Sequence, residues 1–121
     1  MYLLTVNLAR ELVHLAFVGQ VDKGDSVRCR AEIEALVPTL KPGFCLLTDL
    51  SGLEEMDVAC AEDIRAVMEA FRKQGIARIV RVMPDHRKDI GFTVMSYFHY
   101  GHDVVIQTFE FLAQALKTID T

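Results

Sequence analysis

Carboxylate, imidazole and thiol groups fall into separate parts of this sequence. Four carboxylates stand in one short stretch, those of Asp49, Glu54, Glu55 and Asp57. Clustered carboxylates act as general acids and bases, or bind Mg²⁺. No lysine stands near them to orient a phosphoryl group, and the adjacent Glu54 and Glu55 are typical of a solvated turn. We therefore predict structural roles for this group, with Asp57 capping the helix that follows.

Three of the four histidines, His86, His99 and His102, lie close together in the sequence and raise the question of a metal site. A zinc site needs three or four converging ligands, and this spacing matches no zinc framework. A protonated histidine at a helix C-terminus is also favourable without any metal. We predict no metal and no cofactor.

The three cysteines, Cys29, Cys45 and Cys60, are an odd number and lack CxxC spacing. This pattern disfavours a disulfide framework and a zinc cluster, and it favours a reducing, cytoplasmic compartment. Cys60 falls in the first turn of a predicted helix, where the helix dipole lowers the pKa of a thiol. A nucleophilic cysteine would also need a base beside it. We therefore predict that Cys60 is a small residue that fills a helix–sheet junction.

Basic side chains at the start of another predicted helix form the best candidate site for a small anion. His86, Arg87 and Lys88 stand where free backbone N–H groups also attract anions. Arg78 and Arg81, on the preceding predicted strand, are further candidates. The alternative is a solvated helix end, and no glycine-rich phosphate loop accompanies the cluster.

The composition limits the class of protein that these residues serve. A chain of 121 residues, with 51% hydrophobic and 25% charged residues, suits one globular domain, predicted to span residues 1–121. The net charge of −4 provides no overall basic field for nucleic acid. No apolar run approaches the ~20 residues of a membrane span. We predict a soluble cytoplasmic protein.

Hydrophobic periodicity predicts strands that alternate with helices. Asp25 or Ser26 is expected to cap the first helix. The predicted order is β-β-α-β-α-β-α-β-α, an α/β domain with a mixed, mostly parallel sheet of about five strands and four helices. The strands are expected at 2–6, 12–18, 44–49, 77–83 and 104–108, and the last three helices at about 59–74, 86–99 and 110–119.

With this order, Asp49–Asp57 resembles the signature loop of STAS domains, the sulfate transporter and anti-sigma factor antagonist family. There a buried strand ends in Asp-Leu-Ser, and an Asp precedes a helix. Gly19–Asp22 resembles the family's Gly-x-Leu-Asp, and Thr108–Glu110 resembles its closing strand-to-helix step. The resemblance implies a STAS-like fold and a non-enzymatic regulatory role through protein contacts.

The sequence departs from the family at the phosphorylation site. In the anti-sigma factor antagonists, a Ser or Thr would follow Asp57, but here Val58, Ala59 and Cys60 follow. Valine has no hydroxyl, so the resemblance implies that the phosphorylation switch is absent. Ser51 is the alternative acceptor, although its expected role is to satisfy loop backbone groups. In the family, this loop and the helix after it dock the partner, so Asp57–Cys60 become candidate contact residues.

The predicted third helix carries two apolar stripes. Ile90, Val94 and Tyr97 form one face, and Phe92 and Met95 lie on roughly the opposite side. Either the helix is buried on both sides, or Phe92 and Met95 contact a protein partner.

We therefore predict a regulatory or protein-interaction module, acting as a homodimer or within a larger complex. The alternative function is binding of a small lipid-like or anionic ligand between the third helix and the sheet.

Overall fold

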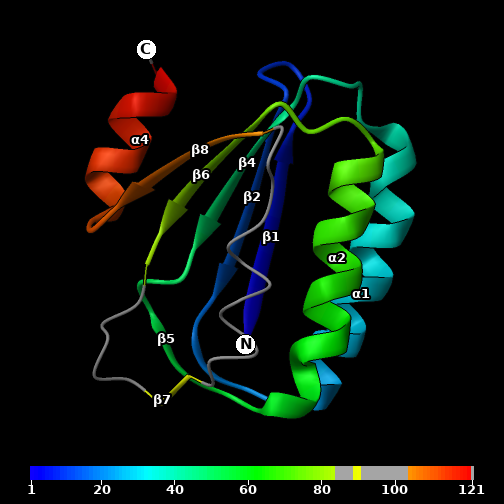
Figure 1. The fold of residues 1–121 in the computed structure, drawn as a ribbon, viewed down its shortest axis with the longest axis vertical. Coiled ribbons are helices and arrows are strands. Elements are labelled where there is room, and N and C mark those ends of the chain that lie inside the picture. Colours follow the sequence, from blue (N-terminus) through cyan, green and yellow to red (C-terminus); the bar gives the residue numbers. More distant parts are fainter. Residues whose placement is uncertain (84–88, 91–103, 121) are drawn as a thin grey trace.

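The computed structural model describes residues 1–83, 89–90 and 104–120. Five strands form the main sheet, in the order β1-β2-β4-β6-β8 (Figure 1). β1 runs antiparallel to β2, and every other pairing in this sheet is parallel. The strands are β1 (Tyr2–Asn7), β2 (Leu12–Phe17), β4 (Cys45–Asp49), β6 (Arg78–Val82) and β8 (Val105–Phe109).

Three shorter strands form a second sheet, in the order β3-β5-β7. They are β3 (Gly19–Val21), β5 (Leu53–Met56) and β7 (Asp89–Ile90), and both of their pairings are parallel. β3 and β5 follow β2 and β4 in the chain after only a few residues. The small sheet therefore carries the chain from the carboxyl ends of the main strands to the helices.

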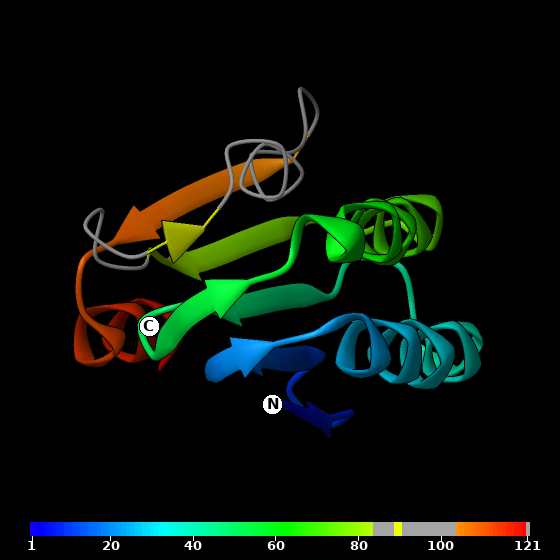
Figure 2. The same ribbon diagram turned by 90° about the horizontal axis from the view of Figure 1, so that it is seen from below.

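Helices cover both faces of the main sheet (Figure 2). α1 (Lys23–Leu36) and α2 (Ala61–Lys73) lie side by side on one face, and α4 (Leu112–Asp120) packs against β6 and β8 on the other. Two single 3₁₀ turns complete the structure, η1 (Val37–Thr39) and η2 (Val58–Cys60). Pro38 within η1 is consistent with the end of α1, because proline cannot continue the helical hydrogen bonds.

The two faces of the sheet belong to two separate cores. The larger core lies under α1 and α2 and includes the fully buried Phe17, Leu46 and Phe71. The smaller core lies under α4, where Leu47, Val80 and Ala115 are fully buried. β4 contributes to both cores, as its nearly continuous apolar sequence predicts for a central parallel strand.

The mixed, mostly parallel sheet of five strands is confirmed, and several details differ from the prediction. Asp22, rather than Asp25 or Ser26, caps α1, and α2 begins at Ala61 after the turn η2. β3 and β5 were not predicted. The described residues contain three α-helices where four were expected in the whole chain.

Most of the predicted third helix, residues 86–99, lies outside the described residues. Asp89 and Ile90 are described, and they form β7 rather than helix. Their pairing with Glu55 and Met56 extends the small sheet, so backbone pairing with a neighbouring strand prevails over the local helical pattern.

Candidate functional site

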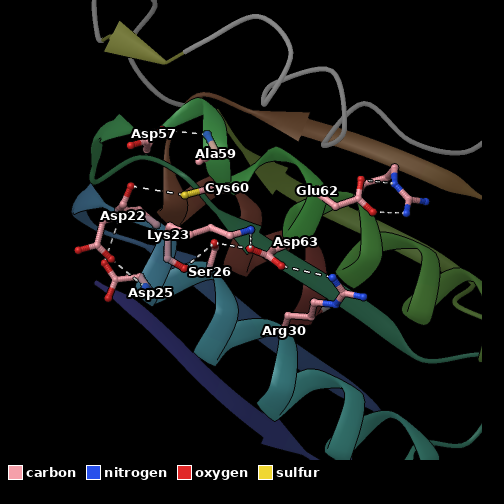
Figure 3. A network of polar contacts seen from close by, with 12 residues as sticks. Asp22, Lys23, Asp25, Ser26, Arg30, Asp57, Ala59, Cys60, Glu62 and Asp63 are labelled. Atoms are coloured by element: carbon pink, nitrogen blue, oxygen red, sulfur yellow. Dashed lines mark hydrogen bonds and ion pairs between the residues drawn. The ribbon is translucent and has the colours of Figure 1, made fainter.

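The pairing of β3 with β5 places the starts of two helices side by side. Val21 and Met56 are register partners at the ends of these strands. The next residues, Asp22 and Asp57, are the N-caps of α1 and η2, and the Asp57 backbone N–H donates to the Val21 carbonyl oxygen (3.1 Å). Figure 3 shows both caps at the same end of the helix pair.

Both aspartates cap through side-chain oxygens. Asp22 Oδ1 accepts from the Asp25 backbone N–H (2.9 Å), and Asp25 Oδ2 accepts from the Asp22 backbone N–H (3.2 Å), which is a reciprocal capping box. Asp57 Oδ1 accepts from the Ala59 N–H (2.8 Å). Asp57 therefore caps the turn η2, which precedes α2, whereas the N-cap of α2 itself is Cys60, without a side-chain hydrogen bond. The cap predicted for the second helix thus lies on the turn before it.

Val58 is held outward between two fixed neighbours. Asp57 binds the backbone on one side, and Cys60, which is fully buried, anchors the other. The Cys60 thiol lies 3.7 Å from the Val21 carbonyl oxygen, within hydrogen-bonding distance for sulfur. The Val58 side chain between them is 65% exposed. Because the backbone is held on both sides of it, this exposed apolar residue is available for contact with little further loss of backbone entropy.

Directly beneath this segment, a buried carboxylate joins α2 to α1. Asp63 is only 3% exposed, and it accepts hydrogen bonds from three side chains of α1 (Figure 3). The donors are Lys23 Nζ (2.6 Å), Ser26 Oγ (2.7 Å) and Arg30 Nη1 (3.3 Å). Burial raises the pKa of Asp63, but these hydrogen bonds outweigh it and hold the pKa below its ordinary value of 3.8.

None of the three thiols is activated. Burial raises the pKa of Cys29 to about 12, and burial also raises the pKa values of Cys45 and Cys60. For Cys60, burial outweighs the lowering of its pKa by the Ser26 side chain and the charge of Lys23. The structure therefore supports the packing role predicted for Cys60 over a nucleophilic one.

The four clustered carboxylates have separate positions rather than one shared site. Asp49 Oδ1 accepts from the backbone N–H (3.0 Å) and the hydroxyl (2.6 Å) of Ser51. Glu54 and Glu55 are exposed on β5. Within the described ranges, no three His, Cys, Asp or Glu side chains are grouped so that they could hold a metal ion.

His86, Arg87, Lys88, Phe92 and Met95 lie outside the described residues, as do His99 and His102.

Arg78 and Arg81, the further candidates for the anion site, have different neighbours. Arg78 Nε donates to Gln107 Oε1, and Arg81 Nε donates to Thr108 Oγ1, each at 2.7 Å. Because the positions differ by three along a strand, the two side chains point to opposite faces of the sheet. They cannot both contribute to one site on a single face.

Sequence reasoning missed the network around Asp63. Lys23, Ser26 and Arg30 are spaced to lie on one side of α1, but this spacing also occurs in many solvent-facing helices. The acceptor lies 33 to 40 residues away in the chain, in a different helix. No local signal identified the pairing.

The order of the elements and the capped segment before α2 define a small α/β domain with a STAS-like fold. No protein-family model matches the sequence, and no curated protein matches it. Several solved structures, in contrast, have a similar fold. SpoIIAA, an anti-sigma factor antagonist solved in its unphosphorylated form, is 16% identical, with a TM-score of 0.67 over 99% of this chain and 98% of that one.

Two further structures share the fold. An uncharacterised DUF3478-family protein from Shewanella loihica PV-4, with a SpoIIAA-like fold, is 16% identical, with a TM-score of 0.67 over 98% of this chain and 93% of its own. An anti-sigma factor antagonist from Mycobacterium paratuberculosis is 18% identical, with a TM-score of 0.57 over 100% and 94% of the two chains. The chain therefore has the SpoIIAA-like fold predicted from its sequence.

None of the described helices is both long enough and apolar enough to cross a lipid bilayer.

The Asp63 network leads to a prediction about pH. Because the pKa of Asp63 is lowered on folding, its ionised form stabilises the protein above its ordinary pKa, and this stability is lost as the pH falls through the folded value. We expect Asp63→Asn to lower the free energy of unfolding by about 1–3 kcal/mol at pH 7, since it leaves Lys23 without its carboxylate and Arg30 with Glu34 alone.

Urea unfolding at several pH values would measure this difference. It should begin to shrink as the pH falls to about 4, where the carboxylate of the unfolded chain binds protons, and should vanish only below the lowered pKa of the folded protein. The matched control is Glu62→Gln, which removes the neighbouring carboxylate. That carboxylate is exposed and pairs with Arg65. This control should change stability by no more than about 0.5 kcal/mol. Equal effects of the two variants would show that Asp63 has no special role.

Proposed function

We propose that this protein is a non-enzymatic regulatory module that binds a protein partner through the η2 segment, Asp57–Cys60, and the exposed side of α2. The observation that carries the proposal is the position of Val58 at the start of η2, 65% exposed and with its backbone held between the Asp57 cap and the buried Cys60. The similarity to two anti-sigma factor antagonists supports regulation through protein contacts at the level of the fold. The class of partner proposed is therefore an anti-sigma factor.

The surroundings of Val58 indicate the chemistry of the partner surface. Within four residues of it in the sequence, every exposed charged side chain is acidic: Glu54, Glu55, Asp57 and Glu62. An apolar residue with an acidic surround is complemented by an apolar pocket with a basic rim. The central valine contributes affinity when it is desolvated, while the surrounding charges set the orientation and the rate of association.

Phosphorylation does not regulate this contact in our proposal. Val58 stands where the STAS resemblance places a Ser or Thr, and valine accepts no phosphoryl group. The Ser51 hydroxyl donates to the Asp49 carboxylate, and a phosphate there would meet this negative charge at close range.

We expect an anti-sigma kinase to leave the wild-type protein unmodified and to phosphorylate the Val58→Ser variant, in which the hydroxyl is supplied at the capped position. Phosphopeptide mapping after incubation with ATP would locate the product. A Val58→Ala variant serves as the control, because it changes the size of the side chain without supplying an acceptor. Phosphate mapped to Ser51 of the wild-type protein would contradict the proposal.

Binding itself is tested with a charge at Val58. Purified anti-sigma factors from the same genome would be titrated into the wild-type protein by calorimetry. Val58→Glu should weaken the interaction by about tenfold or more, because the new carboxylate loses its water in the interface and adds to the acidic surround.

Val105→Glu is a matched control, since Val105 is 61% exposed and lies at the start of β8. β8 is parallel to β6, whose start follows the end of α2, so Val105 is at the other end of the molecule from η2. Its affinity should equal that of the wild-type protein. Equal weakening by both variants, or no binding by the wild-type protein, would contradict the proposed site.

Ligand binding is the second candidate function, and a pocket favours it. The pocket has a volume of about 260 Å³ and lies between the β1–β2 turn and the segment before β4. Leu12, Leu40 and Phe44 supply apolar walls, and Glu11 and Lys41 supply charges. Such a lining suits a small apolar molecule with a polar or charged end. This location differs from the cleft predicted beside the third helix.

Native mass spectrometry of the purified protein would test this second function. We expect a bound small molecule in the wild-type protein, and its loss in Thr39→Trp, because Thr39 is exposed and lines the pocket, so the indole can fill it. Val27→Trp, at an exposed position on α1, should retain the molecule. A wild-type protein that carries no ligand, with a melting temperature unchanged by Thr39→Trp, would contradict the ligand function.

A further inference from the structure

β1 presents an unpaired edge at one side of the main sheet. Among the described residues, β1 pairs only with β2. Met1 and Val18 exchange both backbone hydrogen bonds (3.2 and 2.8 Å), which fixes the alternation along the strand. Leu3, Thr5 and Asn7 therefore direct their backbone groups towards β2. Tyr2, Leu4 and Val6 direct theirs away from it.

This edge lacks the features by which proteins usually prevent edge pairing. Tyr2–Asn7 contains no charged residue and no proline, and its register with β2 runs without a bulge over six residue pairs. Exposed edges are normally protected by lysine, proline, a bulge or a very short strand. Leu3 on this strand is also 53% exposed. The strand is therefore a suitable template for another extended strand.

We propose that the occupant of this edge is β1 of a second copy of the chain, running antiparallel about a two-fold axis at Leu4. In that register, Leu4 faces Leu4 of the other copy, and Tyr2 faces its Val6. All six outward N–H and C=O groups of Tyr2, Leu4 and Val6 are then paired. A shift of the register by two residues leaves the backbone groups of at least one of these three residues unpaired. The symmetric arrangement therefore forms the most backbone hydrogen bonds along this edge.

The helix above β1 fits the same symmetry. The Tyr2 hydroxyl donates to Glu32 Oε1 (2.6 Å), which places α1 over this edge. At 100° per residue, Arg28 and Glu32 both lie about 160° from Arg30, the residue that faces α2. They are therefore on the outward side of α1. A two-fold axis brings two antiparallel α1 helices together and allows Arg28 of each copy to approach Glu32 of the other, so the charges are self-complementary.

This inference extends beyond the proposed function and does not depend on it. The η2 segment and its acidic surround contribute no residue to the β1 edge. A failure of dimerisation would leave docking at Val58 untouched, and a failure of docking would leave the dimer intact.

Paired charge variants test the register. In the proposed dimer, Leu3 lies directly opposite Thr5 of the other copy, on the exposed face of the sheet. Leu3→Lys with Thr5→Lys places like charges opposite each other twice and should weaken the dimer about tenfold or more. Leu3→Lys with Thr5→Glu places opposite charges there and should retain the dimer. Both double variants change the same two exposed positions, and circular dichroism checks that each is folded.

Sedimentation equilibrium would measure association. A wild-type chain that stays monomeric at about 100 µM overturns the proposal, as does equal association of the two double variants.

Disulfide formation supplies a second, independent measurement. Opposed residues of this type, which exchange no backbone hydrogen bonds, have Cα atoms about 4.5 Å apart, within the range for a disulfide. A mixture of Leu3→Cys and Thr5→Cys proteins should form a covalent dimer containing one copy of each under mild oxidation. Neither protein alone should do so, because its new cysteines are diagonal to each other. Covalent dimers from Leu3→Cys alone would show another register and overturn the proposal.

Discussion

The parallel pairing of β3 with β5 is the constraint on which the functional end of the molecule depends. Two strands of three and four residues bring Val21 and Met56 into register, and the caps Asp22 and Asp57 follow at once. The starts of α1 and α2 are then fixed relative to each other before any contact between the helices is made. The outward position of Val58 depends on the same pairing.

The Asp63 network fixes the alignment of α2 along α1. A buried carboxylate loses much of its hydration energy, and three donors from α1 replace it only when the two helices are correctly aligned along their length. An apolar contact would tolerate a slide of one helix along the other, whereas this network does not. We infer that Asp63 specifies the alignment of α1 with α2 more than it adds net stability.

The sequence was sufficient to predict the main sheet but not the contacts of the candidate site. The apolar run of β4 and the two runs of the β1–β2 hairpin are local patterns, so their roles could be predicted. β5 could not, because its adjacent Glu54 and Glu55 break the alternation expected of a strand and its partner is distant in the chain. Asp22 stands three residues before Asp25, and this spacing is typical of a capping box. The N-cap of α1 could therefore have been predicted from the sequence. Asp63 has no local signal, since its burial depends on residues of another helix.

The separate core beneath α4 has a consequence for how the molecule opens. α4 has nine residues, too few for a stable isolated helix, and rests on a small cluster around Leu47, Val80 and Ala115. The caps and charges that bind α1 to α2 lie on the opposite face of the sheet. We therefore expect amide hydrogens of α4 to exchange with solvent through a partial unfolding of lower free energy than that of α1 and α2. The C-terminal segment could detach and return while the regulatory end of the domain keeps its shape.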